Sequence, residues 1–323
     1  MSENRENWSA RSGFILAAIG SAVGLGNIWR FPYMLGQNGG AAFLAVYILC
    51  IILLGLPVML SEFFIGRYTR KNAAGAFKVL APGTKWSLIG YNGVLASFLI
   101  LGFYSVVAGW TLEYIMQAVT GSLSDKAPEA FAQDFKLFST EIFRPILWTV
   151  TFIGLTHFIV VSGVKEGIER TSKVMMPMLF FILLALCIRS VTLPNASEGL
   201  YFLFKPDFSK ITSAVVLSAM GQAFFSLSIG MGCLITYSSY FSKDTKMQIT
   251  ALQVTILDTL VAVMAGIMIF PAVFSFGIAP TAGPELVFIT LPNVFQQAFS
   301  GAPVLAYIFS VLFYVLLAVA ALT

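Results

Sequence analysis

Apolar segments of bilayer-spanning length recur along almost the whole chain. A helix needs about 20 consecutive apolar residues to cross the hydrocarbon core. Irregular chain and open sheet edges are unstable in that core, because lipid leaves their backbone groups without hydrogen-bond partners. The sequence therefore predicts an all-α polytopic membrane protein. The expected spans are residues 12–34, 41–65, 92–120, 145–162, 174–191, 211–240, 251–276 and a last one that begins near residue 302.

Composition supports this class. The 323 residues are 58% hydrophobic and 11% charged, whereas a soluble domain is about half apolar and about a quarter charged. The net charge of +4 is spread over short loops, so we expect a lipid bilayer as partner and no nucleic acid. We expect no enzyme, because the sequence has no GxSxG, HExxH, phosphate-loop or paired-cysteine motif.

The charges of the loops predict the orientation. The loop after the second span holds five basic and no acidic residues, whereas the loop after the third span is mixed and nearly neutral. Basic loops stay on the cytoplasmic side of a membrane. We therefore expect a multi-pass protein of the cell (inner) membrane with a cytoplasmic N-terminus. The five basic residues are Arg67, Arg70, Lys71, Lys78 and Lys85.

Two of the apolar runs are interrupted at their centres. Gly20, Gly24 and Gly26 lie in the middle of the first run, and residues 224–232 interrupt the sixth with serines and glycines. A glycine costs a helix about 1 kcal/mol relative to alanine. Glycines at this spacing fit either a close helix–helix contact or a helix opened beside a binding site. Two such interruptions far apart in sequence favour a transporter site.

The residues at the first break suit ions of both signs. If the helix stops near Val23, the carbonyls of Gly20, Ala22 and Val23 can face a cation. If it restarts near Leu25, the amides of Leu25 and Gly26 can face a carboxylate. The side chain of Asn27 adds an oxygen one turn away.

The motifs GSAVGLGNIWRFP (residues 20–32), NGG (38–40) and ITYSSY (235–240) resemble the neurotransmitter:sodium symporter family, in its bacterial amino-acid branch. The resemblance runs from Arg5 to Thr323. It implies an inverted-repeat transporter fold with discontinuous first and sixth helices, and a capping hairpin at residues 282–298. Residues 1–191 would form the first five-helix repeat, and residues 192–323 the first part of the second repeat. Because the last apolar run ends without a polar flank, we expect a chain cut inside the eighth helix.

The same resemblance implies two sodium sites. Gly24 stands where the monoamine branch of the family has an aspartate, so the negative charge that balances sodium would come from the ligand, as the carboxylate of an amino acid. One site would comprise Ala22, Asn27 and Ser226, and the other Gly20, Val23, Ala320 and Thr323.

Asp258 is a carboxylate inside the seventh span. Such a residue is a functional candidate by default, although one near a helix end can instead reach water. By resemblance, an aspartate here replaces chloride beside the first sodium site, near Tyr47 and Gln222. The sequence therefore predicts no chloride requirement.

The resemblance also implies a substrate pocket. Tyr104 would bond the substrate carboxylate, and Met231 stands where leucine-binding members have phenylalanine. Since methionine is flexible, we expect a pocket for larger hydrophobic or aromatic side chains. The full predicted set is Ala22, Leu25, Gly26, Ile100, Tyr104, Phe225, Ser226, Ser228 and Met231.

Gating residues follow from the same resemblance. Arg30 resembles the outer gate, and Arg5, Trp8 and Tyr237 the inner gate. Glu62 either reaches the membrane surface or supports the opened sixth helix.

The sequence thus predicts sodium-coupled symport of a neutral, hydrophobic or aromatic amino acid by alternating access. Two alternatives stay open at this point. One is a sodium-independent or proton-coupled amino-acid exchanger, and the other is a membrane sensor that binds an amino acid without transporting it.

Overall fold

The computed structural model describes residues 20, 22–124, 126–163, 167, 170–242, 244–277, 286–299 and 301–322. This part of the chain is helical and contains no strand. Six of its helical segments are long and apolar enough to cross a bilayer. The prediction of an all-α membrane protein is confirmed.

The long helices lie where apolar runs predict them. The second span is a continuous helix made of α3 (Ala41–Cys50), the π-helical turn η2 (Ile51–Gly55) and α4 (Leu56–Thr69). It continues four residues beyond the predicted end at residue 65. The other long helices are α6 (Ser87–Val119), α8 (Phe143–Val161), α9 (Arg170–Val191), α13 (Met247–Ser275) and α15 (Pro303–Leu322).

Short helices connect the long ones. The segment predicted as a capping hairpin contains two short helical pieces and no spanning helix, and its residues 282–285 lie outside the described part. Its helix α14 packs against α15 and α7. The short helices are α5 (Ala73–Leu80), α7 (Pro128–Thr140), α10 (Ala196–Phe204), η4 (Phe208–Lys210), η5 (Leu286–Thr290) and α14 (Leu291–Ala298).

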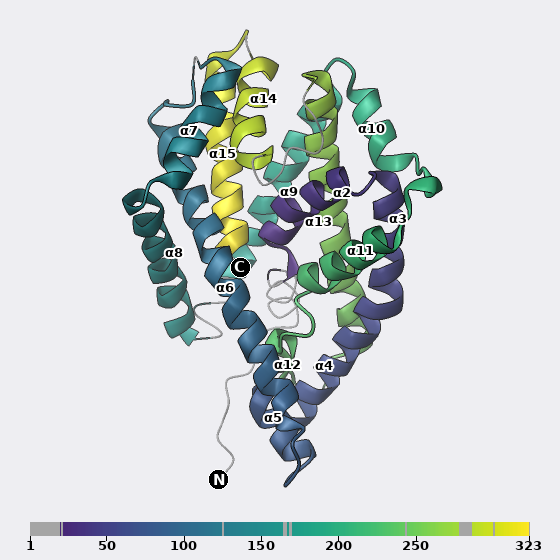
Figure 1. Ribbon diagram of the computed structural model, residues 1–323. Helices are drawn as coiled ribbons and strands as arrows, with labels where there is room; N and C mark the ends of the chain where they lie inside the picture. Colours follow the sequence, from purple (N-terminus) through teal and green to yellow (C-terminus); the bar gives the residue numbers. More distant parts are fainter. Residues whose placement is uncertain are drawn as a thin grey trace.

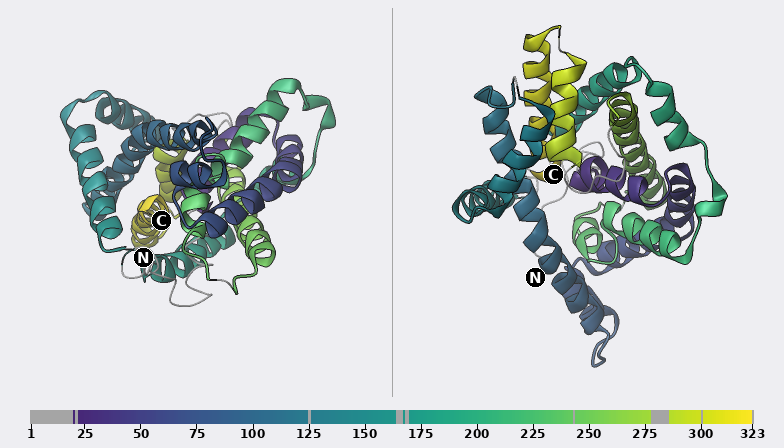
Figure 2. Two further views of the ribbon diagram at one scale, coloured as in Figure 1. Left: turned by 90° about the horizontal axis from the view of Figure 1, so that it is seen from below. Right: turned by 45° about the horizontal axis from the view of Figure 1, so that its top comes forward.

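The bundle has a V-shaped outline in Figure 1. Helices α6 and α4 meet near α5 and diverge toward the end that carries α7, α14 and α10 (Figure 1). The right view in Figure 2 shows the purple segment of the first span between the longer helices, whereas α11 of the sixth span lies nearer the edge, with Leu217 64% exposed. Helix α5 packs on α6 and α4, and α13 packs on α9, α10 and α4. The interrupted segment of the first span therefore lies inside the bundle.

Both interrupted runs are broken helices. Ala22 is helical, Val23 and Gly24 are not, and helix resumes at Leu25 before the π-helical turn η1 (Gly26–Arg30) and α2 (Phe31–Gln37). In the sixth span, α11 (Ser213–Ser226) and α12 (Cys233–Ser238) flank non-helical residues 227–232. Within that break, Gly230 (φ 80°) and Gly232 (φ 77°) adopt left-handed conformations, which glycine tolerates best.

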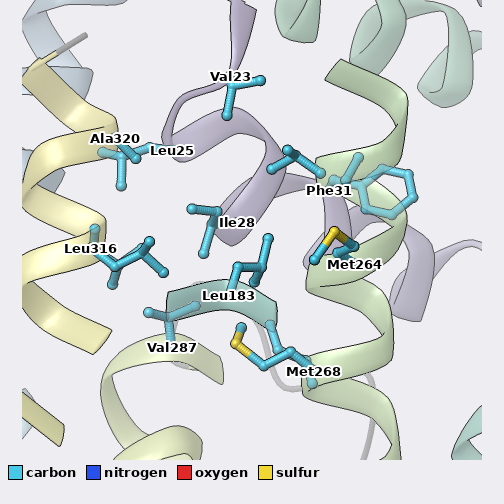
Figure 3. Close-up of a cluster of buried hydrophobic side chains, with 14 of the residues drawn as sticks. Val23, Leu25, Ile28, Phe31, Leu183, Met264, Met268, Val287, Leu316 and Ala320 are labelled. Atoms are coloured by element: carbon cyan, nitrogen blue, oxygen red, sulfur yellow. The ribbon is translucent and has the colours of Figure 1, made fainter. Parts of the chain in front are cut away.

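An apolar cluster holds the broken first helix in place. Val23, Leu25, Ile28 and Phe31 are buried and face side chains of three long helices (Figure 3). Lipid is as apolar as these side chains, so their close packing rather than escape from water stabilises the contact. The partners labelled in Figure 3 are Leu183 of α9, Met264 and Met268 of α13, Leu316 and Ala320 of α15, and Val287 of the short helix η5.

Candidate functional site

A cavity of about 410 Å³ lies between the two helix breaks and α6. This volume suits a small organic ligand. Among the residues predicted to bind substrate, Leu25 and Ser226 are buried and do not line the cavity. The other seven line it: Ala22, Gly26, Ile100, Tyr104, Phe225, Ser228 and Met231.

The glycines of the first break bring its backbone to the cavity surface. A Cβ atom at Gly24 would lie 3.2 Å from both the carbonyl oxygen of Ala320 and the hydroxyl of Tyr104. A Cβ atom at Gly26 would lie 3.0 Å from the ring of Phe225. Both contacts are tighter than ordinary van der Waals packing. A side chain at position 24 would therefore need Ala320 or Tyr104 to shift, and glycine itself brings no charge to the cavity.

Three buried polar side chains meet beside the cavity, one from each of three segments. Asn27 comes from η1, Ser226 from the end of α11 and Asp258 from α13. The amide Nδ2 of Asn27 donates to Asp258 Oδ1 at 2.7 Å and lies 3.2 Å from Ser226 Oγ. Ser226 Oγ lies 3.0 Å from both carboxylate oxygens of Asp258. The fold thus brings together Asn27 and Ser226, two of the three residues predicted for the first sodium site, beside Asp258. The amide oxygen of Asn27 instead accepts a hydrogen bond from the backbone N–H of Gly24 at 3.2 Å.

The carboxylate of Asp258 is fully buried, and none of the ion pairs between described residues includes it. A buried charge is costly unless it is paired. Hydrogen bonds from Asn27 and Ser226 offset part of that cost but leave the charge unbalanced. A small cation that prefers oxygen ligands would complete the arrangement.

The residues of the second predicted sodium site are only partly described. Gly20, Val23 and Ala320 are buried, and Figure 3 shows Ala320 beside Leu25 near the first break. The carbonyl of Ala320 faces Gly24. Thr323, the fourth predicted ligand, lies outside the described residues.

Arg30 joins the first and sixth spans. Its Nη1 donates to Gln222 Oε1 at 2.8 Å, and its guanidinium carbon lies 4.5 Å from the ring centroid of Phe225. Gln222 Nε2 in turn donates to the carbonyl of Gly26 at 3.1 Å. Arg30 thus lies over Phe225, a lining residue of the cavity, although Arg30 itself does not line it. Its gating role stays a prediction. Of the predicted inner gate, Tyr237 lines the cavity, whereas Arg5 and Trp8 lie outside the described residues.

Glu62 supports the break in the sixth span. Its side chain is buried, and Oε1 accepts a hydrogen bond from the amide of Gly230 at 2.6 Å. Its helix α4 is in close contact with α12, because a Cβ at Gly66 would lie 2.1 Å from the carbonyl oxygen of Ile235. Of the two roles that the sequence left open, the structure shows the supporting one.

The sequence analysis missed a second support for the same break. Ser97 lines the cavity, and its hydroxyl donates to the carbonyl of Met231 at 2.9 Å. Ser97, Ile100 and Tyr104 are spaced i, i+3 and i+7, so they share one face of α6. From this spacing, the sequence could have predicted that Ser97 lies on the same side of α6 as the two predicted substrate residues.

Comparisons with known proteins agree with this geometry. A family model described as the sodium:neurotransmitter symporter family matches residues 5–134 and 139–323. The crystal structure of MhsT in complex with L-phenylalanine superposes with a TM-score of 0.93 at 51% sequence identity, over 99% of this chain and 71% of that chain.

Curated relatives include bacterial and animal proteins. The chain is 46% identical over 301 residues to the sodium-dependent transporter YhdH of Bacillus subtilis, covering 92% of this chain and 66% of the relative. It is 40% identical over 331 residues to a sodium-dependent transporter of Haemophilus influenzae, covering 99% of this chain and 71% of that relative. It is 30% identical over 364 residues to the sodium-dependent dopamine transporter of Bos taurus, covering 98% of this chain and 51% of that relative. The chain thus spans about two thirds of the length of these bacterial relatives.

Proposed function

Because this membrane protein belongs to the sodium:neurotransmitter symporter family, we propose that it carries the substrate and sodium sites of a sodium-coupled amino-acid symporter. The family comprises transporters and not enzymes. The substrate is a neutral, hydrophobic or aromatic amino acid. Transport proceeds by alternating access, with the cavity opening to one side of the membrane and then to the other.

The contacts around Gly24 carry this proposal. Position 24 has no side chain, and a Cβ there would lie 3.2 Å from both the carbonyl of Ala320 and the hydroxyl of Tyr104. Asp258 supplies one negative charge for two sodium ions, so in this proposal the ligand supplies the other. An α-amino acid supplies it as a carboxylate, which the amides of Leu25 and Gly26 at the restarting helix can bind.

Two sodium ions fit the proposal. One binds among Ala22, Asn27, Ser226 and Asp258, where the buried carboxylate lacks a cationic partner among the described residues. The other binds carbonyls of the broken first helix, Gly20 and Val23, together with Ala320 and Thr323. In this proposal Asp258 provides a fixed negative charge, so transport needs no chloride.

The lining of the cavity supports a hydrophobic substrate. Ile100, Phe225 and Met231 are apolar, and half-buried Met231 can rearrange around side chains of different shape. The similar structure, MhsT, holds L-phenylalanine. We propose phenylalanine, tyrosine, tryptophan and leucine as the substrates to test.

The remaining sequence predictions belong to the same proposal. Residues 1–191 and 192–323 are parts of two inverted repeats, and the N-terminus is cytoplasmic in the cell (inner) membrane. The basic segment formed by the last turn of α4 and by α5 lies at one end of the bundle in Figure 1. The proposal makes this the cytoplasmic end.

Equilibrium binding tests the proposal directly. Radiolabelled leucine, phenylalanine, tyrosine and tryptophan are titrated onto the purified protein in sodium and in potassium. We expect tight binding only in sodium, because sodium and the substrate carboxylate stabilise each other reciprocally. Equal amino-acid affinity in sodium and in potassium would favour the alternative of a sodium-independent or proton-coupled exchanger. Sodium-dependent binding without uptake into proteoliposomes would favour the sensor.

A further inference from the structure

A second cavity, of about 450 Å³, lies between the end of α4 and the start of α13. It shares no lining residue with the amino-acid cavity. It lies beside the basic loop that begins at Arg67, at the α5 end of the bundle. Its lining residues are Leu60, Phe64, Arg67, Thr245, Lys246, Met247, Gln248 and Ile249.

The α4 wall of this cavity changes from apolar to basic. Leu60, Phe64 and Arg67 are spaced i, i+4 and i+7, so they lie on one face of the helix. The ring of Phe64 is 60% exposed on a helix that crosses the membrane, so it faces lipid. Arg67 Nη1 donates to the carbonyl of Thr245 at 2.8 Å. This bond fixes the guanidinium at the polar end of the cavity and uses one of its five N–H donors.

The α13 wall repeats the arrangement. Exposed Lys246 precedes the helix, and Met247 and Ile249 place apolar side chains in its first turn. Among the described residues, no acidic side chain lines the cavity. The ion pairs between described residues include neither Arg67 nor Lys246. Asp244 lies two residues before Lys246 in the chain, but it is exposed to solvent and does not line the cavity.

We propose that this cavity binds one anionic phospholipid, with its phosphate at Arg67 and Lys246 and an acyl chain along Leu60, Phe64 and Ile249. Charge complementarity supports this occupant, because basic pockets between membrane helices attract anionic headgroups. An arginine fork also matches the oxygens of a phosphate. A soluble anion would leave the apolar half of the cavity uncovered, whereas a phospholipid fills both halves. The inference does not depend on the proposed transport function.

The test measures lipid binding to the delipidated, purified protein by native mass spectrometry. The probes are phosphatidylglycerol and phosphatidylcholine of the same acyl chain length. We expect phosphatidylglycerol to bind more tightly. Arg67→Gln and Lys246→Gln should each weaken its binding about fivefold, and both together about 25-fold, since each basic side chain near the headgroup contributes about equally. Phosphatidylcholine binding should stay unchanged.

Lys85→Gln is the matched control, because Lys85 is an exposed basic residue of the same loop region that does not line the cavity. It should bind phosphatidylglycerol like the unaltered protein. Lys246 is exposed, so Lys246→Gln supplies the test even if Arg67→Gln does not fold. Equal affinity for the two lipids, or equal losses in Lys85→Gln and Lys246→Gln, would overturn the proposal. So would displacement of phosphatidylglycerol by inorganic phosphate, which would identify a soluble-anion site.

Discussion

The side-chain amide of Asn27 lies 2.7 Å from the carboxylate of Asp258, although 231 residues separate them in the chain. This contact joins the broken first helix to α13. Ser226, at the end of α11, bonds to both residues. Three segments that belong to both proposed repeats therefore meet at one buried carboxylate. A cation bound there would respond to movement of any of the three.

Replacement of Asp258 by asparagine tests the role of this carboxylate. Asparagine keeps an oxygen for the bond from Asn27, removes the charge, and replaces the other carboxylate oxygen, which lies 3.0 Å from Ser226 Oγ, by an amide nitrogen. We expect the sodium concentration for half-maximal amino-acid binding to rise about tenfold, or by about 1.4 kcal/mol of free energy. We also expect the variant, unlike the original protein, to bind better in chloride than in gluconate. The control is Asp207→Asn, at an exposed carboxylate. An unchanged sodium dependence of amino-acid binding in Asp258→Asn would contradict a role of Asp258 in sodium binding.

Gly24→Ala tests the close contacts at the first break. The added methyl would lie 3.2 Å from the carbonyl of Ala320 and from the Tyr104 hydroxyl, and overpacking of this kind costs about 1–3 kcal/mol. We expect amino-acid binding in sodium to weaken at least about tenfold. Gly102→Ala is the matched control, because a Cβ at Gly102 on α6 meets nothing within 4 Å. Equal affinities of the two variants would show that Gly24 does not shape the site.

The breaks in the two helices could be predicted because their cause is local. Gly24 and Gly230 weaken a helix wherever they occur, and a break at membrane depth needs a polar partner. The sequence indicated Glu62 as such a partner but left its direction open. Only the packing of α4 on α12, which Gly66 permits, directs the carboxylate to the amide of Gly230. The direction of a side chain depended on a contact between helices far apart in sequence.

A buried polar cluster on α6 illustrates what the sequence did not predict. Glu113 is 3% exposed and accepts hydrogen bonds from Gln117 of α6 and from Arg144 and Trp148 of α8. The two helices approach closely at Gly109, where a Cβ would lie 2.8 Å from the backbone nitrogen of Thr149. No spacing within either helix reveals this pairing. In the sequence, Glu113 is one carboxylate in a long apolar run.

Glu113→Ala should therefore destabilise the attachment of α8. Only 6% of the apolar window of this helix is buried, and α6 is its main neighbour in the bundle, so its attachment depends on the contacts with α6. The change leaves the donors of Arg144 and Trp148 without this acceptor, and a buried polar group without its partner costs about 1–3 kcal/mol. We expect a lower thermal midpoint in detergent. The control, Glu141→Ala, removes a 3.7 Å ion pair between Glu141 and Arg144, and the Glu141 side chain is 44% exposed. The thermal midpoint of this variant should stay close to that of the unaltered protein. Equal midpoints of E113A and E141A would contradict this account.

Ser97→Ala tests whether α6 sets the shape of the substrate pocket. The change removes the hydrogen bond to the carbonyl of Met231 and frees the segment that carries the Met231 side chain into the cavity. A neutral hydrogen bond contributes about 0.5–1.5 kcal/mol. We therefore expect the ratio of phenylalanine to leucine affinity to change about threefold to tenfold, with the sodium requirement unchanged.

Ser105→Ala supplies the matched control, because buried Ser105 lies on the same helix and its hydroxyl bonds to the carbonyl of Leu101 in its own helix. Its affinity ratio should equal that of the unaltered protein. If the role of Ser97 is purely structural, Ser97→Ala should lower the thermal midpoint and weaken the binding of all amino acids by the same factor. A change in the ratio alone identifies Ser97 as a positioning residue for Met231, since only the part of the pocket near the substrate side chain is then altered.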